Sequence, residues 1–154
     1  MKLVHVAAFL CLALLHGCAG DAASWIRDVR AASAEADAAE ARGDAAAAAR
    51  ALERITEGEV PEAVAAEDAR VVRQDAFARL AQLRLALGDP VAALADVDRG
   101  LVLGEREDLF TANLWAMRGR ALEAAGRDRE AARDYHRALI IHEALLDRAL
   151  GEGP

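Results

Sequence analysis

The stretch from Ala112 to Glu143 constrains the fold more tightly than any other part of the chain. It contains two helical patterns that flank a single turn glycine, Gly126. Gly119 lies within the first pattern, and Ala131 and Ala138 lie within the second. Small residues at these places let two antiparallel helices approach closely and leave one face for a further helix pair. The stretch therefore predicts a helical hairpin.

The same stretch resembles a tetratricopeptide repeat, a helix–turn–helix unit in which large and small residues recur at fixed positions. The matching residues are Trp115, Gly119, Leu122, Gly126, Ala131, Tyr135 and Ala138. Two positions depart from the family pattern: Asp128 replaces an aromatic residue and Glu143 replaces the terminal proline. The resemblance implies stacked hairpins, with a partner peptide lying along the groove that the first helix of each hairpin lines.

Two weaker copies of this pattern precede it. Turn glycines at Gly43, Gly88 and Gly126 divide the chain into three hairpins. The second hairpin has the matching residues Phe77, Ala81, Gly88, Ala93 and Gly100, whereas the first keeps mainly small residues. We predict an all-α fold of three antiparallel hairpins stacked as a short tetratricopeptide-like solenoid, because about three units suffice to bury a continuous core. The alternative is an irregular helical bundle.

Periodicity and stop signals predict the helix boundaries. Helices are expected at Trp25–Arg42, Ala45–Glu57, Glu62–Leu87, Val91–Leu103, Leu109–Ala125 and from Asp128 to about Leu150. Ser24, Asp89 and Asp108 are expected to cap helices, and Pro61 and Pro90 to begin them. Much of the 55% hydrophobic content is alanine and only 4% is aromatic, which favours closely packed helices over a sheet.

The first 18 residues have the pattern of an export signal. Lys2 precedes an apolar segment, Leu3–Leu15, that is too short to span a bilayer. It ends in Leu15-His16-Gly17-Cys18, which resembles a bacterial lipobox. The resemblance implies cleavage before Cys18 and attachment of lipid to its thiol. Cys11 would leave with the signal, so the mature chain could form no internal disulfide.

The predicted organisation is a signal peptide at 1–17, a lipidated cysteine and short tether at 18–23, a helical domain at 24–150 and a tail at 151–154. The resemblance to lipoproteins implies an exported, lipid-anchored protein that faces the periplasm, and Ala19 favours the outer membrane. The alternative is a simple secretory signal cleaved near Ala19 or Ala23.

Charge and motifs argue against several classes of function. The net charge is −7 with both signs interspersed, which argues against binding to nucleic acid. His136 and His142 are spaced so that they lie on different faces of a helix, which argues against a metal pair. Acid pairs such as Asp96 and Asp98 are interpreted as solvated charge at helix ends. The chain has no phosphate-binding loop or G-x-S-x-G motif, and we expect no catalysis, cofactor or metal.

Protein binding is the function that these features favour. The resemblance places a peptide-binding groove along the outward positions of first helices, at Asp75, Gln82, Asn113, Arg120 and Glu123. The last helix is apolar on more than one face, and Ile140 is the candidate contact there. We therefore predict a noncatalytic adaptor or assembly factor in the cell envelope. The alternatives are a self-associating structural component that uses the last helix, and an enzyme accessory domain that binds a small ligand.

Overall fold

The computed structural model is helical throughout the part of the chain that it describes. It describes the backbone of residues 3–151 and the side chains of residues 21–151. In order, the helices are α1 (Leu3–Ala41), α2 (Ala45–Glu57), α3 (Ala66–Ala86), α4 (Pro90–Val102), α5 (Leu109–Ala124) and α6 (Asp128–Leu150). Residues 3–151 contain no β-strand. The predicted all-α class is confirmed.

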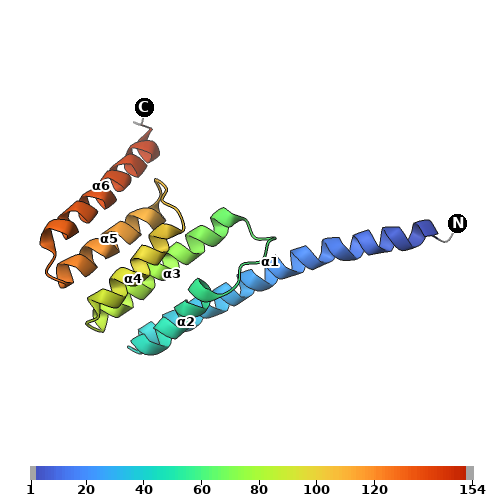
Figure 1. The fold of residues 1–154 in the computed structure, drawn as a ribbon, viewed down its shortest axis with the longest axis horizontal. Helices are drawn as coiled ribbons and strands as arrows, with labels where there is room; N and C mark the ends of the chain where they lie inside the picture. Colours follow the sequence, from blue (N-terminus) through green and yellow to red (C-terminus); the bar gives the residue numbers. More distant parts are fainter. Residues whose placement is uncertain (1–2, 152–154) are drawn as a thin grey trace.

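Each helix packs against the next one along the chain, so that the helices form a stepwise row (Figure 1). The contacts are most extensive within the pairs α1–α2, α3–α4 and α5–α6, and α3 also lies against α5. Among the described helices, the backbone of α1 lies close to that of α2 alone, and the backbone of α6 lies close to that of α5 alone. The two helices at the ends of this described row therefore have one side without a neighbouring helix.

The turn between α3 and α4 has the glycine, the capping aspartate and the first-turn proline in the roles that the sequence predicts. Gly88 adopts a left-handed backbone with φ of +78°, a conformation that glycine tolerates at little cost. The carboxylate of Asp89 then accepts a hydrogen bond from the backbone N–H of Ala92 at 2.9 Å. Pro90 is the first residue of α4. Asp108 caps α5 in the same way, as predicted.

Two predicted helix starts were wrong. α3 begins at Ala66 rather than at Glu62, because the N–H of Val64 donates to the carbonyl of Pro61 and closes a turn before the helix. α1 begins at Leu3, so Ser24 lies inside a helix rather than at its N-cap. The segment from 18 to 23 continues this helix, because it is rich in alanine and contains no proline. The side chain of Cys18 lies outside the described residues.

The core consists mainly of small side chains. Alanines from the first five helices are fully buried, so the helix axes can approach one another closely. These alanines surround a few large residues, of which Leu52, Leu80, Leu114 and Leu122 are among the largest that are fully buried. The fully buried alanines are Ala36, Ala39, Ala48, Ala51, Ala81, Ala93, Ala112 and Ala121. Stabilisation is therefore spread over many small contacts.

Several residues that carry the tetratricopeptide resemblance lie where helices pack closely. Gly119 of α5 faces the ring of Tyr135 on α6, and a Cβ atom added to Gly119 would lie 2.6 Å from Cε1 of that ring. Trp115, Ala131 and Ala138 are buried in the same pair. In the preceding pair Ala93 is fully buried, while Gly88 and Gly126 form the two turns.

We predict that Gly119→Ala lowers the free energy of unfolding by about 1–3 kcal/mol, because the added methyl group must displace the ring of Tyr135. The measurement is chemical denaturation followed by circular dichroism. Gly119→Ala combined with Tyr135→Leu is expected to recover part of the loss, since the smaller side chain makes room. A Gly119→Ala variant as stable as the wild type would show that α5 and α6 can move apart at this crossing without loss of stability.

Candidate functional site

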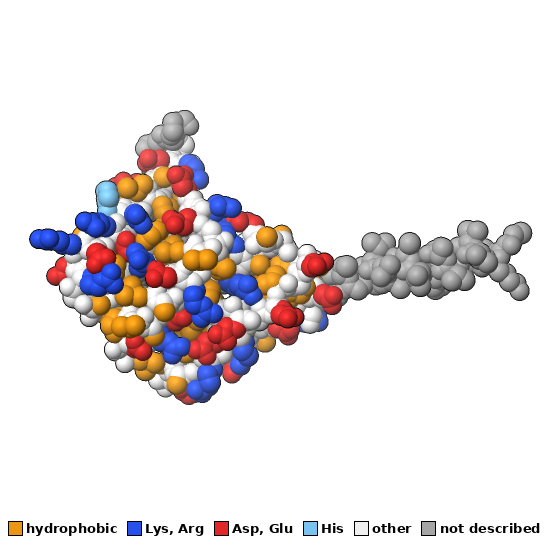
Figure 2. Space-filling model, viewed as in Figure 1, with side chains coloured by type: hydrophobic (Ala, Val, Ile, Leu, Met, Phe, Trp, Pro, Cys, Tyr) orange, Lys and Arg blue, Asp and Glu red, His pale blue; other side chains and the backbone are white. Residues whose placement is uncertain are grey.

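All six candidate contact residues are exposed, and they lie on three helices. Asp75 and Gln82 lie on α3, and Ile140 lies on α6. The other three, Asn113, Arg120 and Glu123, lie on α5. Acidic and basic side chains intermingle on the face shown in Figure 2, with apolar atoms between them. Charge of one sign therefore does not dominate that face.

Asp75 lies at a hollow that we call the inner hollow. Its volume is about 210 Å³, which suits one or two side chains of a partner rather than a whole drug-sized ligand. Four helices contribute to it, and its lining is apolar except for Asp75 and Ser33. The lining residues are Val29, Ser33, Leu52, Ile55, Val71, Val72, Asp75, Ala76 and Phe110. The structure thus brings one candidate residue together with apolar side chains from distant parts of the sequence.

The environment of Asp75 favours a cation beside it. Loss of water around the carboxylate raises the pKa of Asp75, and nearby Asp37 adds to the effect while Arg79 opposes it. Arg79 is already engaged, since it forms ion pairs with Asp37 and Glu40 of α1 at 2.6 Å each. A positive group supplied by a partner would therefore stabilise the ionised form of Asp75.

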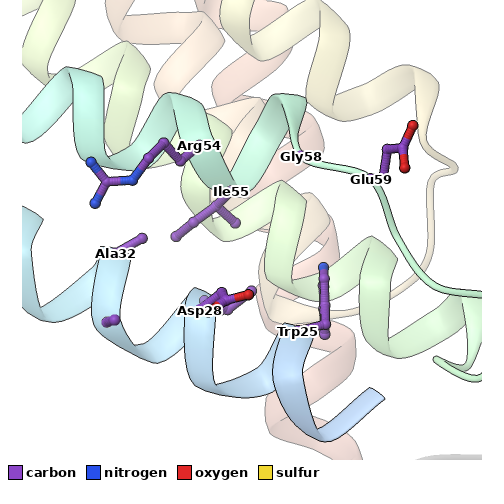
Figure 3. Close-up of a pocket in the computed structure, with 9 residues that line it drawn as sticks. Trp25, Asp28, Ala32, Arg54, Ile55, Gly58 and Glu59 are labelled. Carbon is purple, nitrogen blue, oxygen red and sulfur yellow. The ribbon is translucent and has the colours of Figure 1, made fainter. Parts of the chain in front are cut away.

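A second cleft opens between α1, α2 and the segment that follows α2. Its volume is about 420 Å³. Figure 3 shows Trp25 and Asp28 on α1, and Glu59 on the segment after α2. Ile55 lines both this cleft and the inner hollow. This cleft was not predicted from the sequence, because it depends on where the segment after α2 lies. Trp25, an aromatic residue at the start of the domain, was the available signal.

Arginines bridge successive helices through carboxylates. The two bridging sets are Arg84 with Glu53 and Asp96, and Arg118 with Asp98 and Asp134. Asp96 and Asp134 are 8% and 4% exposed. Burial raises the pKa of Asp96, and the charges of Arg84 and Arg99 oppose that rise. The interpretation of Asp96 as solvated charge was therefore wrong, whereas Asp98 is exposed as expected.

A buried polar network positions the start of α5, and sequence reasoning missed it. Gln74 is fully buried, and its Nε2 donates to the carbonyl oxygen of Gly104 at 2.9 Å. Its Oε1 accepts a hydrogen bond from Arg70. Arg70 also forms an ion pair with Asp108, the cap of α5. This network holds the first turn of α5, from which Phe110 reaches the inner hollow.

Glu123 is engaged with Tyr135, the one tyrosine of the chain. The Tyr135 hydroxyl donates to Oε2 of Glu123 at 2.7 Å. Burial of the phenol, followed by its interaction with the Glu123 carboxylate, raises the pKa of Tyr135 to about 12. A guanidinium nitrogen of Arg120 lies 3.8 Å from the sulfur of Met117. Of these two candidates, Glu123 already has a hydrogen-bonding role within the fold.

The described residues offer no membrane-spanning helix: none of their helices is both long enough and apolar enough to cross a bilayer. No group of three or more His, Cys, Asp or Glu residues in the same part of the chain is arranged to hold a metal ion. Comparison of the chain with protein-family models, with curated proteins and with solved structures finds no match.

We predict that the Tyr135 phenol titrates near pH 12 in the folded protein, rather than near its ordinary value of about 10. A raised folded-state pKa stabilises the fold below about pH 10, and this contribution is lost as the pH rises toward 12. Ultraviolet absorbance gives the titration directly because the chain has a single tyrosine.

Glu123→Gln is expected to move this titration to lower pH, since it removes the negative charge beside the phenol. Tyr135→Phe is the blank for the absorbance change. A wild-type midpoint near pH 10 would contradict the hydrogen-bonded, partly buried phenol.

Proposed function

We propose that the mature chain is a lipid-anchored protein of the bacterial cell envelope that binds a segment of another protein and holds it near the membrane. In this proposal the helix pairs are tetratricopeptide-like repeats, and the chain is a noncatalytic adaptor or assembly factor. The partner segment lies across the inner hollow and along the exposed positions Gln82, Asn113 and Arg120.

The inner hollow is the observation that carries this proposal. Val29 of α1, Val72 of α3 and Phe110 of α5 line it, so each of the three helix pairs contributes an apolar side chain. Covering such a surface contributes about 25 cal/mol for each Å² of apolar area removed from water. A hollow of this kind favours a partner that inserts an apolar side chain rather than one held by charge alone.

Asp75 indicates that the partner segment carries a basic residue. Its carboxylate lies at the inner hollow, and the loss of water around it is what raises its pKa. A lysine or arginine next to the inserted apolar side chain would restore a favourable environment for the ionised carboxylate. The proposed ligand is therefore an extended peptide segment with an apolar residue next to a basic one.

The anchor rests on the sequence Leu15-His16-Gly17-Cys18. A lipid attached to Cys18 would place the domain beside the membrane, because Ala32, which is buried in the core, follows soon after it. Two or more acyl chains give lasting attachment, whereas one chain binds reversibly. The position of Ala19 favours the outer membrane as the site of attachment.

Mass spectrometry of the mature N-terminal peptide tests the anchor. We expect an acylated peptide that begins at Cys18, and we expect Cys18→Ser to abolish both this modification and cleavage at this bond. Cys11→Ser is the matched control and should leave the mature peptide unchanged, since Cys11 is removed with the signal. An unmodified wild-type peptide, or one that begins at Ala19 or Ala23, would refute lipid anchoring at Cys18.

Capture of partners from crosslinked envelopes tests the binding surface. We expect Asp75→Asn and Phe110→Ala each to reduce recovery of the same partner about ten-fold, which corresponds to about 1.4 kcal/mol of binding free energy. Asp68→Asn is the matched control, because Asp68 is an exposed aspartate of the same helix outside the inner hollow. Circular dichroism verifies that each variant remains folded. Equal recovery by all of these variants would exclude the inner hollow as the binding surface.

A further inference from the structure

One side of α6 carries a row of exposed apolar residues. Leu139, Leu146 and Leu150 are 52%, 57% and 62% exposed. At about 100° of rotation per residue, these leucines lie on the same side of the helix as His142, which is also exposed. Successive members of this set, which we call the α6 row, are three or four residues apart. This spacing is typical of a helix side that packs along a second helix.

The corresponding side of α4 shows what such a surface packs against. Alignment of Gly88 with Gly126 places Leu101 of α4 at the position of Leu139. Leu101 is half-buried and packs against the core. About one turn earlier on α4, Asp98 forms an ion pair with Arg118 of α5 at 2.8 Å. Thus α4 is packed against α5 beside the position of Leu101, whereas the described helices leave Leu139, Leu146 and Leu150 of α6 more than half exposed.

We propose that a second copy of this chain covers the α6 row, with the two α6 helices antiparallel about a two-fold axis. An axis that passes between His142 and Glu143 places Leu139 opposite Leu146 of the partner subunit. It also places His142 opposite Glu143 of the partner subunit, and the symmetry repeats this pair of complementary groups on the other side of the axis. A parallel arrangement would instead oppose the two Glu143 carboxylates.

The far end of the helix row argues against head-to-tail stacking of copies. The exposed surface of α1 in its described part is mainly charged, with residues such as Arg27, Arg30 and Glu35. Ile26 is the one large apolar residue exposed on that part of α1. Packing α1 on the α6 row would bury charges against leucines, which is costly. The two-fold arrangement pairs apolar side chains with one another.

The α6 pairing leaves the inner hollow open, since no residue of α6 lines it. The dimer would therefore present two copies of the peptide-binding surface. A partner with two suitable segments would bind both copies, and the second contact would be intramolecular, which strengthens attachment without any new kind of contact. This inference is independent of the proposed function, because the dimer forms whether or not the inner hollow binds a peptide.

Light scattering and sedimentation of the mature chain purified from its host in detergent, corrected for bound detergent and any attached lipid, test the dimer. We expect a dimer for the wild type and a monomer for Leu139→Glu combined with Leu146→Glu. The dissociation constant should rise about a hundred-fold, since two apolar contacts are lost from each subunit. Val91→Glu is the matched control: Val91 is 74% exposed, and it lies on α4, away from the α6 row.

A charge exchange tests the antiparallel register. His142→Glu alone should weaken the dimer, because two carboxylates would then face each other across the axis. His142→Glu combined with Glu143→His should restore it, because the exchange recreates the complementary pair. Asp75→Asn should remain dimeric, which separates this test from that of peptide binding.

Three outcomes would overturn the proposal. They are a monomeric wild type, a dimer that survives the paired leucine substitutions, and a dimer that Val91→Glu disrupts as strongly as those substitutions do. Failure of the charge exchange to restore the dimer would refute the register. Circular dichroism distinguishes loss of the dimer from loss of the fold, and the exposure of the substituted residues predicts that the fold persists.

Discussion

The close approach of the helices is the constraint on which the rest of the structure depends. A Cβ atom on Gly100 would lie 2.8 Å from Leu114, and one on Gly119 would lie 2.6 Å from Tyr135. Helices at such short range need few large side chains between them, which is why alanine dominates the core. Short spacing also lets an arginine on one helix reach carboxylates on its neighbours, as Arg118 does. The small residues therefore determine both the packing and the pattern of ion pairs.

The buried aspartates add specificity to this packing. Asp96 and Asp134 occupy matching places on α4 and α6, and each meets an arginine from the preceding helix. A buried ion pair adds little net stability, because removing both charges from water costs about as much as their attraction returns. An unpaired buried carboxylate is much more costly. If one helix slid along another, these carboxylates would lose their arginine partners. The ion pairs therefore favour one helix–helix register among the many that an alanine-rich surface permits.

The sequence predicted features that depend on neighbouring residues and missed those that depend on distant ones. Gly88, Asp89 and Pro90 act within one turn, so their roles follow from residue type alone. The burial of Asp96 depends on its ion pair with Arg84 from another helix, and the residues next to Asp96 in the sequence do not predict that contact. The exposure of Asp75 was an expectation from the resemblance to a tetratricopeptide repeat. The inner hollow beside it was not predicted, because it needs Phe110 of α5 and the buried network that holds the start of that helix.

The inner hollow and the α6 row differ in how much of the helix row each one requires. Every pair contributes an apolar side chain to the inner hollow, so that surface requires the whole row and would be lost if the pairs separated. The α6 row requires only the last helix, and it remains uncovered because the described row of helices ends there. A copy-to-copy contact at that end removes leucines from water without closing the inner hollow. The open end of the row can thus serve assembly while the inner surface stays free for a ligand.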